Sequence, residues 1–171
     1  MHRGIYIGRF QPFHRGHREV VEAIVEQVDE LVLGIGSAGD SHTETDPFTS
    51  GERIMMITKS LVDLDLVTYA VPIEDLERNS VWVSHVMSMS PRFDLAFSNN
   101  PLVVRLFEEA EVPVEQVPMV DRDRYEGTEV RRRMIADDGW EELVPPAVVE
   151  VVNEIDGIAR IQQVSRDDSG I

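Results

Sequence analysis

The chain has 171 residues, no cysteine and 42% hydrophobic residues, which predicts one folded domain and excludes a disulfide framework and long internal disorder. No apolar run approaches the roughly 18–20 residues that span a bilayer and no signal peptide opens the sequence, so we expect a cytoplasmic protein without a membrane partner. The net charge of −16 repels polyanions and argues against a nucleic-acid partner.

Short apolar runs alternate with helical patterns from the start of the chain. Residues 4–7 and 31–35 are too short for helices and suit buried strands. Between them, apolar residues recur at helical spacing over residues 20–28. This βαβ unit predicts a parallel strand pair joined by a right-handed crossover.

The alternation continues to residue 161. Strands are expected at residues 66–71, 93–97 and 114–117. Helices are expected at residues 49–61 behind a capping box, at 80–89 capped by Ser80, at 100–110 capped by Asn100, from Thr128 onward, and around residues 148–155. Residues 1–161 therefore predict a single α/β domain, a Rossmann-like fold with a doubly wound, open parallel sheet of about five strands and helices on both faces. Residues 162–171 are polar and expected to fray.

Residues 8–17 lie where an anion site belongs, between the first strand and the first helix. His14 and His17 are three residues apart, so both rings can project from one face of the helix start. Gly16 lets a ligand approach the backbone, and Arg9 adds a positive charge. The histidines could instead bind a metal or merely cap and pack, but no further histidine or cysteine cluster completes a zinc site.

A second helix start follows at residues 125–134. Thr128 is expected to be the N-cap, which again places an anion-binding helix end here. Arg131 lies one turn in and can reach phosphates, because guanidinium is a preferred fork for them. Three consecutive arginines point in three directions, so Arg132 and Arg133 are interpreted as interface or surface residues.

Both segments resemble a known family. His14-Arg15-Gly16-His17 matches the HxGH motif of the nucleotidylyltransferase superfamily, and residues 127–131 resemble its second motif, ISxTxxR. The longer string of residues 8–14, with residues 98–101 and 122–125, is similar to the archaeal nicotinamide-nucleotide adenylyltransferases. The resemblance runs from about residue 4 to residue 161. Glu126 departs from it, since the family usually has a small residue there.

The resemblance implies a reaction of ATP with nicotinamide mononucleotide (NMN) that forms NAD and pyrophosphate by direct attack of the NMN phosphate. It implies catalytic roles for His14, His17 and Arg131. It implies that ATP is bound by Ile7, Gly8, Arg9, Phe10, His14, Gly16, His17, Thr128 and Arg131, and NMN by Ser37, Asn79 and Trp82. Mg²⁺ is expected to be held mainly by the phosphates, with no protein metal site. Relatives form hexamers, so a homo-oligomer, most simply a hexamer, is expected.

Alternatives remain open at this stage. The acceptor could be another phosphate compound, the chain could be a nucleotide sensor without turnover, and Trp82 could simply pack in the core. Residues 34–39 fit the dinucleotide fingerprint G-x-G-x-x-G, but a polar stretch follows instead of a helix, so we interpret them as a flexible exit from the strand into a loop. Asp121 and Asp123 alternate with arginines and indicate an exposed loop, not a metal pair. The acidic composition, with Lys59 as the only lysine, resembles proteins adapted to high salt, although an ordinary acidic protein is the alternative.

Overall fold

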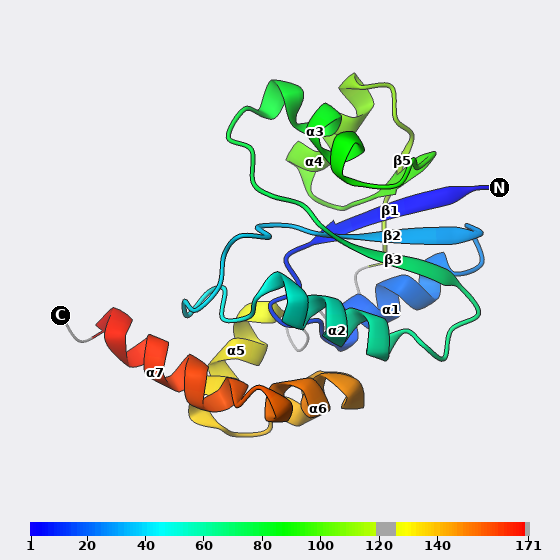
Figure 1. Ribbon diagram of the computed structural model, residues 1–171. Coiled ribbons are helices and arrows are strands. Elements are labelled where there is room, and N and C mark those ends of the chain that lie inside the picture. The colour runs from blue at the N-terminus through cyan, green and yellow to red at the C-terminus, as the bar shows by residue number, and fades with distance from the viewer. Residues whose placement is uncertain (119–125, 170–171) are drawn as a thin grey trace. The chain divides into compact units, whose positions relative to one another are not determined.

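The computed structural model describes residues 1–118 and 126–169 (Figure 1). The strands are β1 (Arg3–Gly8), β2 (Glu30–Ile35), β3 (Val67–Pro72), β4 (Leu95–Phe97) and β5 (Val114–Glu115). The α-helices are α1 (Arg15–Ile24), α2 (Ser50–Ser60), α3 (Trp82–Met89), α4 (Pro101–Glu109), α5 (Gly127–Ala136), α6 (Pro146–Glu154) and α7 (Gly157–Ser169). Two short 3₁₀ helices are η1 (Asn79–Val81) and η2 (Trp140–Leu143).

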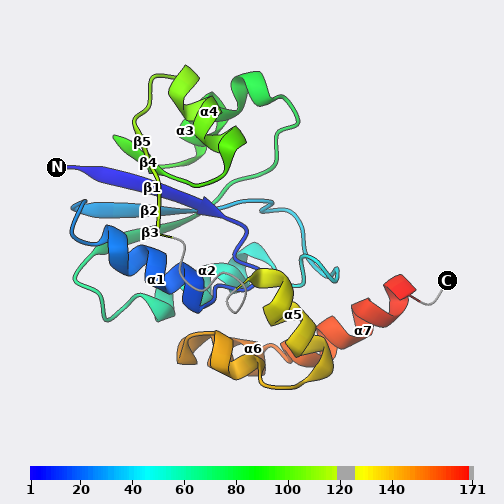
Figure 2. The same cartoon turned by 180° about the vertical axis from the view of Figure 1, so that it is seen from behind.

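The five strands form one sheet in the order β3-β2-β1-β4-β5, and each neighbouring pair is parallel (Figure 2). The predicted doubly wound parallel sheet is therefore confirmed. The strand order reverses between β1 and β4, which pair through Gly4 and Leu95. In such sheets, ligands bind beyond the carboxyl ends of the strands at this reversal. The end of β1 at Gly8 is thus the position from which a site is expected to be built.

The chain divides into two compact units, each assembled from three segments. The first unit comprises Met1–Arg9, Val20–Ala38 and Leu64–Pro118, and it holds the whole sheet. The second comprises Phe10–Glu19, Gly39–Asp63 and Met119–Ile171. Because the segments interleave along the chain, no single linker in the sequence marks the division.

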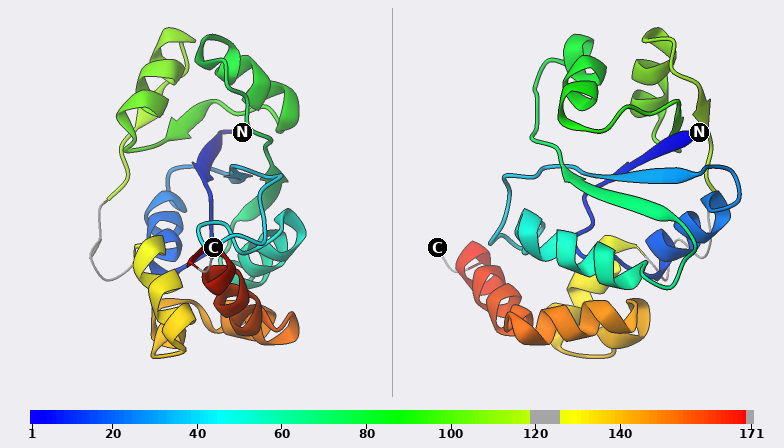
Figure 3. Two further views of the ribbon diagram at one scale, coloured as in Figure 1. Left: turned by 90° about the vertical axis from the view of Figure 1, so that its left-hand side faces the viewer. Right: turned by 45° about the vertical axis from the view of Figure 1, so that its right-hand side comes forward.

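In the first unit, α3 and α4 cover one face of the sheet, and the part of α1 from Val20 onward lies on the other (Figures 1 and 3). The core under α3 and α4 includes Ile5, Val32 and Phe107, all at most 1% exposed. Helix α4 begins as predicted, because the Asn100 side chain accepts hydrogen bonds from the Leu102 and Val103 backbones and Pro101 occupies the first turn.

In the second unit, α2 packs against α6, and α7 packs against α5 and α6 (Figure 3). The predicted capping box opens α2: Thr49 accepts from the Glu52 backbone, and the Glu52 carboxylate accepts from the Thr49 backbone. Trp140, 1% exposed, is the largest fully buried side chain among the described residues.

Several expected element boundaries are wrong. Val81, not Ser80, precedes α3, because the 3₁₀ turn of η1 intervenes. Glu126, not Thr128, occupies the N-cap position of α5 and makes no side-chain capping bond. Helix α1 ends at Ile24, short of residue 28. Helix α7 includes residues 162–169, which were expected as a frayed tail, since Ile161 is buried and Gln162 donates to the Ile135 carbonyl. Among the described residues, no helix has the length and apolar character needed to cross a membrane.

Candidate functional site

Two stacked histidines mark the start of α1, in the second unit. The His14 and His17 ring centroids are 3.6 Å apart, at an interplanar angle of 25°. Two buried aromatic residues support them: the Phe10 ring meets His17 edge-on at 4.8 Å, and the Phe13 ring stacks on it at 5.5 Å. The prediction that both imidazoles share one side of the helix start is thus confirmed by their geometry.

Backbone hydrogen bonds select the tautomer of both rings. The Gly16 N–H donates to His14 Nδ1, and the His14 N–H donates to His17 Nδ1, each at 3.1 Å. A neutral ring whose Nδ1 accepts carries its hydrogen on Nε2. Backbone N–H groups at a helix start commonly face an anion directly. Here the two rings accept from two of these backbone donors, the N–H groups of His14 and Gly16, and carry their own hydrogens on Nε2.

Both rings are held neutral. Burial, followed by the nearby positive charge of Arg131, lowers the pKa of His14 from 6.5 to about 3. Burial and the neighbouring His14 lower the pKa of His17 well below its usual value. The pair therefore offers hydrogen-bond donors without a positive charge at neutral pH, and the charge that an anion needs must come from elsewhere.

Arg131 supplies a charge in the same unit. Its Nη1 donates to the main-chain carbonyl of Gln11 at 3.0 Å, and its Nη2 donates to Thr128 Oγ1 at 3.4 Å. A Cβ on Gly127 would lie 2.9 Å from Arg131 Nη1, so glycine leaves room for the guanidinium. Thr128 thus acts as a partner of Arg131 and not as the helix cap. Such a fixed planar fork suits phosphate oxygens.

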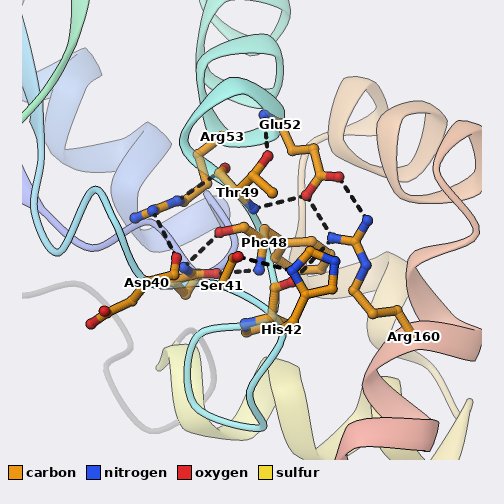
Figure 4. Close-up of polar contacts among 10 residues, drawn as sticks. Asp40, Ser41, His42, Phe48, Thr49, Glu52, Arg53 and Arg160 are labelled. Carbon is orange, nitrogen blue, oxygen red and sulfur yellow. Dashed lines mark hydrogen bonds and ion pairs between the residues drawn. The ribbon is translucent and has the colours of Figure 1, made fainter.

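The loop over residues 39–49 is pinned to neighbouring elements of the second unit (Figure 4). The buried Arg53 donates to the carbonyls of Thr49 and Asp40. Arg160 of α7 donates to the Pro47 carbonyl at 3.1 Å and forms a two-point ion pair with Glu52 at 2.7 and 2.8 Å. Although burial raises the pKa of Glu52, hydrogen bonds from Arg160 and the Thr49 backbone bring it below its usual value.

The remaining predicted site residues belong to the first unit. These are Ile7, Gly8, Arg9, Ser37, Asn79 and Trp82. Ile7 and Gly8 end β1, and the Gly8 carbonyl accepts from the Gly36 backbone at 2.8 Å. The interpretation of residues 34–39 as the exit from a strand into a loop is confirmed, because Gly34 and Ile35 end β2 and the next helix begins only at Ser50.

The predicted acceptor residues lie in three elements of the first unit: Ser37 in the loop after β2, Asn79 in η1 and Trp82 at the start of α3. Ser37 has a positive φ of 48°, and its hydroxyl donates to Asp75 Oδ1 at 3.2 Å. Asn79 is exposed at the start of η1. Trp82 is half-buried and meets the Phe107 ring edge-on at 5.5 Å, so the core-packing interpretation describes part of its surface.

Arg132 and Arg133 are bound to the carboxylate of Glu129, at 2.7 and 3.0 Å. Hydrogen bonds from both arginines lower the pKa of Glu129 to about 2. A polar cavity of about 350 Å³ adjoins these arginines; it is lined by Arg132, Arg133, Ala136, Asp138, Gly139 and Glu142.

Asp121 and Asp123 lie outside the described residues. Within the described part of the chain, no group of three or more histidine or acidic side chains could hold a metal ion.

Three curated relatives match almost the whole chain, and each is named nicotinamide-nucleotide adenylyltransferase. The protein of Halobacterium salinarum is 69% identical, over 99% of this chain and 96% of its own length. That of Haloarcula marismortui is 67% identical, over 98% and 89%. That of Methanosarcina barkeri is 56% identical, over 99% and 98%. The first two come from halophiles, in line with the acidic, lysine-poor composition.

Solved structures share the fold at low identity. A bifunctional NMN adenylyltransferase/ADP ribose pyrophosphatase of Francisella tularensis, complexed with AMP and manganese, superposes with a TM-score of 0.78 at 17% identity over 98% of this chain. The chain spans about half of that protein, 53% of its length. A structure described as a nicotinate-nucleotide adenylyltransferase of Vibrio parahaemolyticus superposes with a TM-score of 0.67 at 17% identity, covering 94% and 96%. The family model for cytidylyltransferase-like proteins matches residues 5–133, and with these relatives it establishes that the chain belongs to the cytidylyltransferase-like family.

Proposed function

We propose that this protein transfers the adenylyl group of ATP to NMN, forming NAD and pyrophosphate. The observation that carries the proposal is the pair of neutral, stacked histidines beside the oriented guanidinium of Arg131. Support comes from relatives of that name at 56–69% identity over nearly the whole chain.

The phosphate side of the reaction is assigned to the second unit. An oxygen of the NMN phosphate attacks the α-phosphorus of ATP in line, and the bond from that phosphorus to the bridging oxygen breaks as pyrophosphate leaves. Nε2–H groups of His14 and His17 donate to the phosphate oxygens that gain charge, and Arg131 with Thr128 holds the leaving β- and γ-phosphates. No protein nucleophile is required. When bound with ATP, Mg²⁺ would be held mainly by the phosphates and would neutralise part of their charge.

Further contacts to the nucleotide are assigned by sequence position. Ile7 and Gly8 end β1, and Arg9 follows and leads directly into Phe10, so we assign these four residues and Gly16 to the ATP side. On the acceptor side, we assign the exposed part of Trp82 to stacking on the cationic nicotinamide ring, an interaction worth about 0.5–2 kcal/mol. Asn79 and Ser37 supply polar contacts to the same molecule.

An acceptor panel tests the proposal. The wild-type chain, with ATP and Mg²⁺ in molar KCl, receives NMN, nicotinic acid mononucleotide, pantetheine phosphate or flavin mononucleotide, and pyrophosphate release is followed. Release with NMN above the other acceptors supports the proposed reaction. Release only with another acceptor would keep the phosphate chemistry and refute NMN. ATP binding without release for any acceptor would instead indicate a nucleotide sensor.

We further propose that the protein is a homo-oligomer, a hexamer in the simplest case. The acidic chain and the arginines of α5 provide charges that could pair between copies. Sedimentation in low and molar salt tests this, and a monomer in both conditions would refute it.

A further inference from the structure

We propose that Gln11 is a positioning residue that couples the pinned loop over residues 39–49 to the phosphate-binding guanidinium of Arg131. The inference rests on the proposed function only in that Arg131 binds the phosphates of ATP. All the contacts that carry it lie within the second unit.

The side chain of Gln11 acts as a two-point clamp on one residue of the loop. Its Nε2 donates to the Phe48 carbonyl at 3.0 Å, and its Oε1 accepts from the Phe48 N–H at 2.9 Å. This is the hydrogen-bond pattern of a paired strand, made by an amide side chain. Gln11 is 3% exposed and Phe48 is fully buried, so water cannot replace either bond.

Phe48 is a fixed partner because its neighbours are fixed. Arg160 holds the Pro47 carbonyl, and the capping box with Arg53 holds Thr49 (Figure 4). The clamp therefore ties Gln11 to a part of the loop that is itself tied to α2 and α7. Because the Gln11 side chain is bound to this fixed part of the loop, the Gln11 backbone is also held in position.

The main chain of Gln11 passes this constraint to Arg131. The Gln11 carbonyl accepts from Arg131 Nη1 at 3.0 Å, while Thr128 Oγ1 accepts from Nη2. Both terminal nitrogens, Nη1 and Nη2, thus have a defined partner, and this orients the guanidinium plane before a ligand binds. A group held in its binding geometry beforehand loses less conformational freedom on binding.

Gln11 has no part in the chemistry itself. Its side-chain amide bonds Phe48 through both Nε2 and Oε1 and is buried, so we assign it to holding the loop and not to binding phosphate. Its effect on ATP must pass through Arg131, and this makes the proposal distinguishable from a general effect on folding. Replacement of Gln11 is therefore expected to weaken ATP binding when residue 131 is arginine, and to have little effect when the planar guanidinium is absent.

A double-mutant cycle measures that dependence. Gln11→Leu removes both bonds to Phe48, and Arg131→Lys keeps a cation but lacks the planar fork. We expect Gln11→Leu to weaken binding of Mg²⁺–ATP about tenfold in the Arg131 chain and less than about twofold in the Arg131→Lys chain, as coupled residues do. The dissociation constant is measured by calorimetry in molar KCl without an acceptor.

A matched control is available on α7. Gln162 also donates its amide to a main-chain carbonyl of the second unit, but to that of Ile135, at 3.1 Å, and not to the loop that Gln11 binds. Gln162→Leu is expected to change ATP affinity equally in both backgrounds. If Gln11→Leu does not fold, Gln11→Glu serves in the same cycle, because its carboxylate still accepts from the Phe48 N–H but cannot donate to the Phe48 carbonyl.

Equal weakening by the Gln11 substitution in both backgrounds, or no weakening in either, would overturn the proposal. Because the readout is ATP binding alone, it is independent of the acceptor. Failure of wild-type protein to bind Mg²⁺–ATP would refute the proposed function itself, a result separate from the outcome of the cycle.

Discussion

The neutral state of His14 predicts a distinct loss of stability in mild acid. Its pKa is about 3 in the folded protein and 6.5 in the unfolded chain, because burial and the charge of Arg131 oppose protonation. Between these values the unfolded chain binds a proton that the folded protein does not, so stability falls as the pH falls below 6.5. The folded state therefore loses about 2 kcal/mol between pH 7 and pH 5 through this one residue.

The matched variant is His14→Asn. An asparagine Oδ1 can replace Nδ1 as the acceptor of the Gly16 N–H, but asparagine does not titrate. Urea unfolding of both proteins in molar KCl gives the two stability profiles; it is followed by tryptophan fluorescence, to which the buried Trp140 of the same unit contributes. The lowered carboxylate pKa values of Glu52 and Glu129 act below this pH window.

As the pH falls from 7 to 5, the free energy of unfolding should decrease more steeply for the wild type than for His14→Asn. The wild-type value minus the variant value should be about 2 kcal/mol lower at pH 5 than at pH 7. Parallel profiles between pH 7 and pH 5 would contradict a lowered pKa of His14 in the folded protein. They would mean that His14 takes up its proton in the folded state as readily as in the unfolded chain, and that the site offers a cationic imidazole.

Three further outcomes are expected. Arg160→Met leaves the Glu52 carboxylate, which is 14% exposed, without its ion-pair partner. The free energy of unfolding of the second unit, measured in urea, should fall by about 2 kcal/mol. A decrease below about 0.5 kcal/mol would contradict the role of the pair. His17→Asn should lower kcat for NAD formation about 10²- to 10³-fold, with a much smaller change in ATP affinity, and an unchanged kcat would remove His17 from the chemistry. Trp82→Leu should raise the KM for NMN about tenfold while ATP affinity, measured by calorimetry, stays constant; an equal effect on both would indicate a core role alone.

Features that depend on neighbouring residues could be predicted from the sequence. The capping box of Thr49 and Glu52 and the Asn100-Pro101 helix start are local patterns, and both form as expected. The pairing of His14 with His17 follows from their spacing at a helix start. The parallel sheet follows from the alternation of short apolar runs with helical segments.

Features that depend on distant contacts could not be predicted. The clamp of Gln11 on Phe48 joins residues 37 positions apart, and nothing in the pattern around Gln11 distinguishes it from a loop residue. Thr128 looks like a cap, but the helix begins one residue earlier and leaves its hydroxyl for Arg131. The polar end of the chain forms α7 because Arg160 and Gln162 find partners on other elements.

The most direct test of the account is an end-point assay of the wild-type protein with ATP, Mg²⁺ and NMN in molar KCl. NAD is read through an added dehydrogenase, and pyrophosphate is measured in the same sample. We predict NAD and pyrophosphate in equal amounts, with both formed more slowly by His17→Asn. Pyrophosphate without NAD, or neither product from a protein that binds ATP, would contradict the proposed transfer to NMN.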